Sequence, residues 1–103
     1  MPRGPSREGS ALDGWDRYRA DVVHRVFVSA GAVPFRLPDD PAAYAWTTVL
    51  GGVRRVATFS PEQGRSGVRA DQLELLARRL FGEEAAPRIL QRIREEGGLI
   101  LDL

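Results

Sequence analysis

The chain contains no cysteine and no lysine, and all 15 of its basic residues are arginine. Without cysteine it can form no disulfide, no thiolate zinc site and no iron–sulfur cluster, and it has no cysteine nucleophile. Without lysine it has neither a Schiff-base residue nor a P-loop lysine. Arginine without lysine, together with frequent Ala and Gly, is typical of GC-rich coding, so we expect a bacterial or phage source.

Long apolar runs and strong net charge are also absent. No stretch approaches the 18 or so apolar residues that a membrane helix requires, and we expect a cytoplasmic protein with no membrane partner. The net charge of +1 gives no global field that would attract nucleic acid or an anionic membrane. Residues 1–10, MPRGPSREGS, are polar and rich in Pro and Gly, which predicts a disordered tail, and residues 11–103 are expected to form a single α+β domain.

The C-terminal third has the clearest helical pattern. Asp71 and Glu74 have capping-box spacing, apolar residues recur at helical intervals to Phe81, and Gly82 supplies a stop. A second helix is predicted over 83–96. The closing residues 99–103, LILDL, alternate as in a strand.

The segment DDPAAYAWTTVLGG, residues 39–52, fits two structures. Asp40 is a good N-cap and apolar residues follow at helical spacing, so we favour a helix that ends at Gly51. The alternative is a β-hairpin with Gly51 and Gly52 in its turn. Residues 53–59 are predicted to be a strand in either case.

The segment from residue 13 to residue 30 is also ambiguous. A helix capped by Asp13 and stopped by Gly31 is slightly favoured over a strand paired with residues 32–37. Pro34 restricts residues 32–37 to an edge strand or an extended segment. The predicted fold is therefore α+β, with about three to four helices packed on a short, about three-stranded, mainly antiparallel sheet.

No constellation of side chains indicates an enzyme. His24 is the only histidine and lies among valines, which favours a packed histidine over a catalytic or metal-binding one. The adjacent carboxylates have structural uses at helix ends or in ion pairs, and no nucleophile elbow or phosphate loop is present. We expect no catalytic residue, no metal and no cofactor.

Four arginines form the basis of an alternative function. They have few acidic neighbours in sequence and could bind a nucleic-acid backbone: Arg54, Arg55, Arg65 and Arg69. Phe59 is the only aromatic residue that lies among these arginines in sequence and on which a base could stack. Nucleic-acid binding is therefore the second hypothesis.

Four aromatic residues are candidate partner-binding residues, because Trp and Tyr are favoured as interface anchors: Trp15, Tyr18, Tyr44 and Trp46. The leading hypothesis is a non-catalytic protein-interaction module. It would be an accessory or assembly factor that binds another protein chain or itself as a homo-oligomer.

Two stretches resemble known families. The segment FGEEAAPRILQRIREEGGLIL, about a fifth of the chain, resembles the end of the N-terminal domain of the SBDS ribosome-maturation family. The segment FRLPDDPAAYAW resembles, in layout, segments of small phage tail assembly chaperones, which act by binding other chains. Neither resemblance assigns a site residue.

Overall fold

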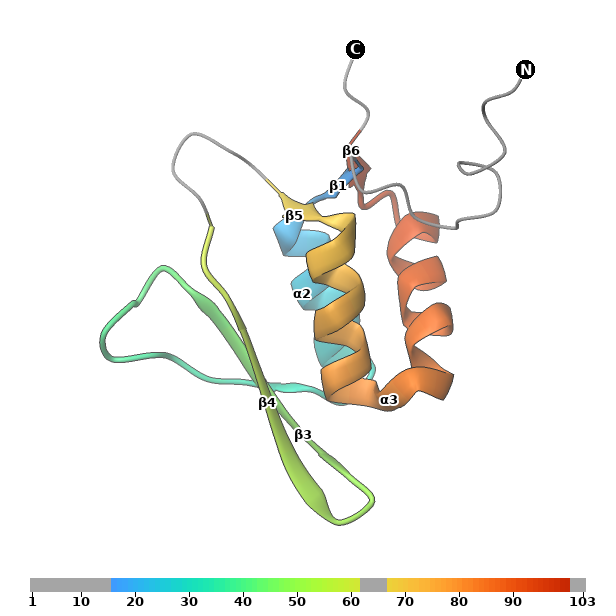
Figure 1. Ribbon diagram of the computed structural model, residues 1–103. Helices are drawn as coiled ribbons and strands as arrows, with labels where there is room; N and C mark the ends of the chain where they lie inside the picture. The colour runs from blue at the N-terminus through green and yellow to red at the C-terminus, as the bar shows by residue number, and fades with distance from the viewer. Residues whose placement is uncertain (1–15, 62–66, 101–103) are drawn as a thin grey trace, which may run out of the picture.

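The computed structural model describes residues 16–61 and 67–100 and shows two helices with two three-stranded antiparallel sheets (Figure 1). The helices are α2 (Ala20–Ser29) and α3 (Ala70–Glu95). The larger sheet has the order β2 (Val33–Pro34), β3 (Tyr44–Leu50), β4 (Val53–Phe59). The smaller sheet has the order β5 (Val68–Arg69), β1 (Arg17–Tyr18), β6 (Leu99–Ile100).

Strands β3 and β4 form a hairpin, so the helix favoured for residues 40–50 is wrong and the hairpin alternative is confirmed. Gly51 and Gly52 have φ angles of 59° and 80°, as the two central residues of a type I′ turn require. Seven cross-strand pairs follow, from Leu50↔Val53 at the turn to the far end of the ladder. The predicted strand over residues 53–59 is confirmed.

The predicted cap of the rejected helix has another role. Asp40 accepts a hydrogen bond from the Ser60 hydroxyl at 2.9 Å, which ties the loop before β3 to the residue that follows β4. The edge position of Pro34 is confirmed, because β2 is the outer strand beside β3. A proline tolerates that position because its missing N–H costs no ladder hydrogen bond on the open side.

Helix α2 confirms the helical interpretation of the ambiguous N-terminal segment, with a later start than predicted. It begins at Ala20 because residues 17 and 18 form β1, and Asp13, the predicted cap, lies outside the described residues. Val22, Val23, Val26 and Phe27 form its buried stripe. The last turn is followed by Gly31.

Helix α3 joins the two predicted C-terminal helices into one element that is broken at Gly82. The φ of 87° at Gly82 is left-handed, and the chain turns back there, as Figure 1 shows. The N-cap is Arg69, whose backbone N–H donates to Gln72 Oε1 at 3.4 Å, so the predicted Asp71 cap is displaced by two residues. Leu75, in the second turn of the helix, is 65% exposed.

The structure therefore shows an α+β single domain with two helices among its described residues, fewer than the three to four predicted. The predicted closing strand is present at residues 99–100, and residues 101–103 lie outside the described part, as does the predicted tail. Neither described helix is long and apolar enough to cross a membrane.

Both helices pack on the same face of the β3–β4 hairpin. Phe27 of α2 meets Trp46 edge-on, with ring centroids 4.9 Å apart. Thr48 donates from its hydroxyl to the Leu80 carbonyl of α3 at 2.5 Å. The core between these layers also contains Leu73 and Ile93. The opposite face of the hairpin is covered by no described helix (Figure 1).

Candidate functional site

The uncovered face of the larger sheet carries exposed apolar side chains. Side chains alternate between the two faces of a strand, so in β3 and β4 Trp46, Ala57 and Phe59 face the helices and are buried. Their neighbours Val49 and Val56 point the other way and are 64% and 38% exposed.

Strand β2 continues this apolar surface. Val33 pairs with Thr47 and is 59% exposed, and Phe35, whose N–H donates to the Ala45 carbonyl, is 41% exposed. We call Val33, Phe35, Val49 and Val56 the outer face. Antiparallel sheets with one solvated face usually place polar residues there, so four large apolar side chains depart from that pattern and make this face a candidate site.

The two ends of the outer face differ in charge. Arg54 lies next to the hairpin turn and reaches Thr47 Oγ1 at 3.3 Å. At the other end of β4, the Asp40 carboxylate lies against the Ser60 hydroxyl. The outer face is therefore apolar in the middle, with a cation at one end and a carboxylate at the other.

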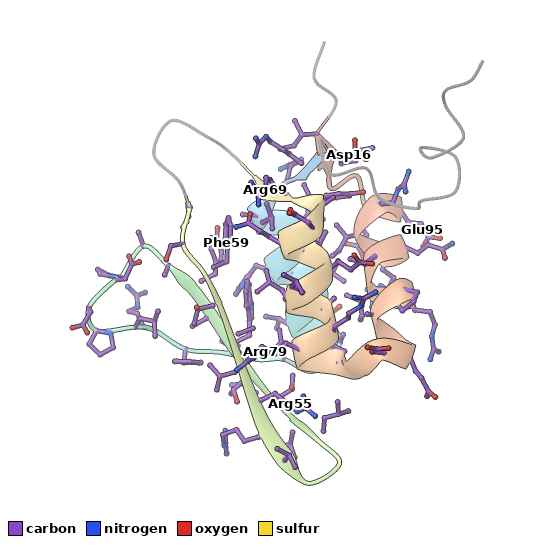
Figure 2. The ribbon with its side chains drawn as sticks, in the orientation of Figure 1. Asp16, Arg55, Phe59, Arg69, Arg79 and Glu95 are labelled. Atoms are coloured by element: carbon purple, nitrogen blue, oxygen red, sulfur yellow. The ribbon has the colours of Figure 1, made fainter. Side chains whose placement is uncertain are left out.

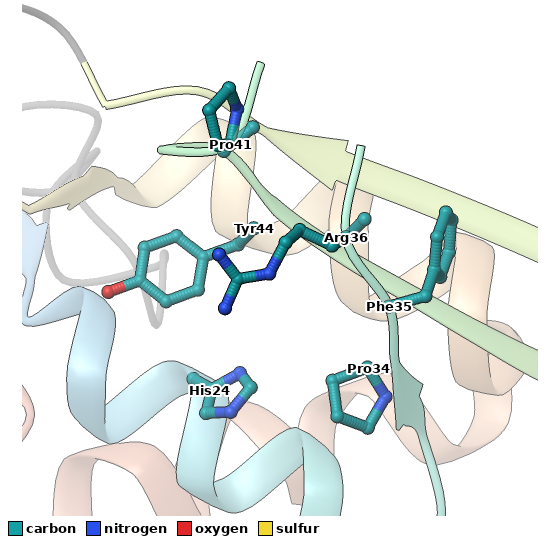
Figure 3. Close-up of a pocket in the computed structure, with 8 residues that line it drawn as sticks. His24, Pro34, Phe35, Arg36, Pro41 and Tyr44 are labelled. Carbon is teal, nitrogen blue, oxygen red and sulfur yellow. The ribbon is translucent and has the colours of Figure 1, made fainter. Parts of the chain in front are cut away.

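Beside β2, an open pocket of about 310 Å³ is lined by residues of α2, of the segment from β2 to β3, and of the start of β3 (Figure 3). Its polar groups come from three separate segments: His24 from α2, Arg36 from the loop after β2, and Tyr44 from β3. The remaining lining is apolar: Pro34, Phe35, Pro41, Ala43 and Ala45.

His24 has a fixed hydrogen-bonding state. Trp46 donates from its indole Nε1 to His24 Nδ1 at 3.1 Å, and an indole nitrogen can only donate. Nδ1 is therefore the acceptor, and the ring proton of the neutral imidazole is on Nε2. The Tyr44 ring lies 5.6 Å from the imidazole and stacks on Trp46 at 5.8 Å, so the three rings hold one another in place.

Arg36 supplies the charge of the pocket. Figure 3 shows its guanidinium extending between the Tyr44 ring and the His24 imidazole. It forms no hydrogen bond or ion pair with any residue in the part of the chain that the structure describes. No carboxylate lines the pocket.

The four arginines of the nucleic-acid hypothesis are not brought together. Arg54 points to the outer face, whereas Arg55, one residue later, points to the helix side of β4. Arg69 is at the far end of the molecule from the hairpin turn and pairs with Asp71 at 3.1 Å (Figure 2). Arg65 lies outside the described residues. The predicted set therefore forms no single basic patch among the residues described.

Arg55 instead lies in a hollow with two arginines of α3. Arg78 pairs there with Glu74 at 3.3 Å, and Arg79 donates from Nε to the Val56 carbonyl. The Nε of Arg55 is buried and has no hydrogen-bond partner among the described residues. Two of these three cations thus already have intramolecular partners.

The structure divides the four predicted aromatic anchors. Tyr18 and Trp46 are 0% and 1% exposed and belong to the core. Tyr44 is half-buried in the pocket wall, and Trp15 lies outside the described residues. Their binding roles stay predictions, and Tyr44 is the one that the described surface makes accessible.

Metal and nucleophile sites gain no support. No group of three His, Asp or Glu side chains that could hold a metal ion occurs within residues 16–61 and 67–100. Ser60 donates to Asp40, and Ser29 donates to the Val26 carbonyl at 3.0 Å. His24 is held by Trp46, and no serine of the described ranges is among its ring or hydrogen-bond contacts.

Sequence reasoning missed the outer face and Arg36. The signal for the face was present in the alternation of Val49 with Thr48 and of Val56 with Arg55, once residues 44–59 are taken as a hairpin. Arg36 had no local signal, because the pocket exists only where three segments meet.

No family model matches the chain, and no curated protein sequence or solved structure is significantly similar to it.

Proposed function

We propose that the protein is a non-catalytic protein-interaction module that binds another polypeptide through the outer face of its larger sheet. The observation that carries this proposal is the set of four exposed apolar side chains on that face, Val33, Phe35, Val49 and Val56. Burying exposed apolar area contributes roughly 25 cal/mol per Å², so a partner that covers these side chains gains binding free energy.

The partner favoured by the surface is a second copy of the chain. Two sheets pack well face to face because their side-chain rows interdigitate about 10 Å apart, and a second outer face offers a flat β surface of the same composition. A two-fold arrangement that reverses the strand direction would place Arg54 of one copy near the Asp40 end of the other. Both ends of the interface would then carry opposite charges.

The experiment is size-exclusion chromatography with light scattering and absorbance at two wavelengths. The wild-type chain has a mass of 11.4 kDa, and we expect a species of twice that mass with no nucleic-acid absorbance. The variant Val33→Thr/Val49→Thr/Val56→Thr keeps the β-branched shape and removes apolar surface. We expect it to be monomeric at the same concentration.

The matched control is Val53→Thr. Val53 is 55% exposed, but by the alternation of β4 it points to the opposite side of the hairpin. It should associate like the wild type. If the wild type is monomeric and binds a different protein through these valines, the partner is that protein and not a second copy of the chain. Co-eluting nucleic acid that salt removes would contradict the proposal and favour the arginine hypothesis.

A further inference from the structure

We propose that the pocket between His24, Arg36 and Tyr44 binds a carboxylate group. The inference rests on the polar lining of the pocket and not on the exposed valines; of the four outer-face residues, Phe35 alone also lines the pocket. The carboxylate could belong to a small organic acid or to an acidic side chain of a polypeptide, and the chemistry of recognition is the same for both.

Hydrogen-bond donors and a positive charge dominate the polar lining. The Trp46 hydrogen bond fixes Nδ1 of His24 as an acceptor, so the ring N–H is on Nε2, which donates to no described residue. The Arg36 guanidinium carries five N–H donors and has no partner among the described residues. Neutral imidazole and guanidinium together therefore offer N–H groups to an acceptor.

The fork of Arg36 selects among acceptors. A guanidinium binds a planar carboxylate through two parallel N–H···O bonds, and such charge-assisted bonds are about twice as strong as neutral ones. A cation is disfavoured, because the pocket lining has a positive charge and no carboxylate. A neutral amide would lack the charge that Arg36 complements.

The walls set the size and shape of the ligand. The Tyr44 ring and the two prolines, Pro34 and Pro41, are apolar surfaces on which a short hydrocarbon or aromatic group can pack (Figure 3). The volume of about 310 Å³ is at the lower end of the range for ligand pockets. It suits a carboxylate with a small attached group.

Nuclear magnetic resonance on the ¹⁵N-labelled full chain tests the proposal. The probe is benzoate, titrated at constant ionic strength, and benzamide is its uncharged counterpart of the same shape. His24 is the only histidine, so its imidazole signal is assigned without ambiguity. We expect benzoate to shift the signals of His24, Tyr44 and the Trp46 indole N–H, and benzamide to leave them unchanged.

The decisive variant is Arg36→Gln. Arg36 is exposed, so this change should preserve the fold, which the unchanged remainder of the spectrum verifies. We expect it to weaken benzoate binding about tenfold or more, the usual effect of losing a hydrogen-bonded charge. Arg88→Gln removes an equal charge from an exposed site on α3 and should bind benzoate as the wild type does.

A second pair of probes separates the two sources of the carboxylate. The capped tripeptide acetyl-Ala-Glu-Ala-amide is compared with its Gln analogue on the same samples. Tighter binding of the Glu peptide than of benzoate assigns the pocket to a polypeptide ligand, and the reverse order assigns it to a small acid. The proposal is overturned if neither acid shifts the pocket signals, if benzamide binds as well as benzoate, or if Arg36→Gln has no effect.

Discussion

The two faces of the β3–β4 hairpin are built from the same strands but have opposite environments. On the inner face, Trp46 and Phe59 are 1% and 7% exposed beneath the helices. On the outer face, Val49 and Val56 are 64% and 38% exposed. One residue of offset along a strand decides between these environments, because successive side chains point to opposite faces.

This difference separates stability from recognition. Removing apolar volume from the inner face leaves a cavity that the packed helices cannot fill. Removing it from the outer face changes only a surface in contact with water. Substitutions on the outer face can therefore test binding without unfolding the domain, whereas substitutions on the inner face test the fold.

The largest effect is expected from Trp46→Ala. It removes a buried side chain that packs on Phe27 and donates to His24, and we expect a loss of about 3–5 kcal/mol in the free energy of unfolding. Urea denaturation followed by circular dichroism measures it. Val49→Ala on the outer face serves as the comparison and should cost less than about 1 kcal/mol. Equal losses for the two variants would contradict the division of the faces.

The next largest effect is expected at the hairpin turn, which sets the register of both faces. Gly52 has a φ of 80°, and a β-branched residue there is strained, so Gly52→Val should destabilise the domain by about 1–2 kcal/mol. Gly51→Asn creates the Asn-Gly pair that type I′ turns favour and should be close to neutral. Thermal denaturation of both variants checks this. A larger loss for Gly51→Asn than for Gly52→Val would exclude the type I′ geometry.

A smaller effect is expected at Tyr18, whose side chain is buried in the core although it ends in a polar hydroxyl. Burial raises the pKa of its phenol above the usual 10.0; nearby Arg94 opposes this rise, and Asp16 adds to it. Its hydroxyl has no hydrogen-bond partner among the described residues, so Tyr18→Phe should change stability at neutral pH by less than about 1 kcal/mol, in the stabilising direction.

The pH dependence of Tyr18 follows from the direction of its pKa shift. The contribution of Tyr18 to the free energy of unfolding is fully present below the pKa of the phenol in the unfolded chain, near 10.0. It is lost as the pH rises through the higher pKa of the folded state, because the unfolded chain releases the phenol proton first. The chain has no lysine or cysteine to obscure this alkaline titration. We expect the free energy of unfolding to fall less between pH 8 and pH 11 for Tyr18→Phe than for the wild type. An equal fall in both proteins would contradict the raised pKa of Tyr18.

The smallest effect on stability is expected for Val33→Thr/Val49→Thr/Val56→Thr. Each replacement keeps a β-branched residue in its strand, and we expect a total change below about 1 kcal/mol. The measurement is made at low protein concentration, since dimer formation would add to the apparent stability. A loss as large as that of Trp46→Ala would mean that these valines belong to the core.

The helices were predictable because their signals are local and agree with one another. The stripe of Val22, Val23, Val26 and Phe27 and the break at Gly82 are both present in the structure. The position of the α3 cap was wrong by two residues because Arg69 and Asp71 both precede the apolar repeat. Local sequence does not determine which of them ends the preceding strand.

Residues 44–50 were not predictable from periodicity. Ala45, Trp46 and Val49 fit a helical stripe, and Tyr44, Trp46 and Thr48 equally fit one face of a strand. Pairing with β4 decides between them, and that pairing depends on a neighbouring segment. The pocket could not be predicted from the sequence either, because it depends on three segments meeting in space: those that carry His24, Arg36 and Tyr44.

Strand β1 pairs with segments that are synthesised long after it. Arg17 pairs with Arg69 on one side and with Ile100 on the other, so β1 is the central strand of the smaller sheet (Figure 1). On the ribosome β1 is made before both of its neighbours, and the second of them lies about 80 residues further along the chain. The hairpin can form as soon as residue 59 is free, whereas the smaller sheet closes only after residue 100 is free, so the two sheets complete at different times during synthesis.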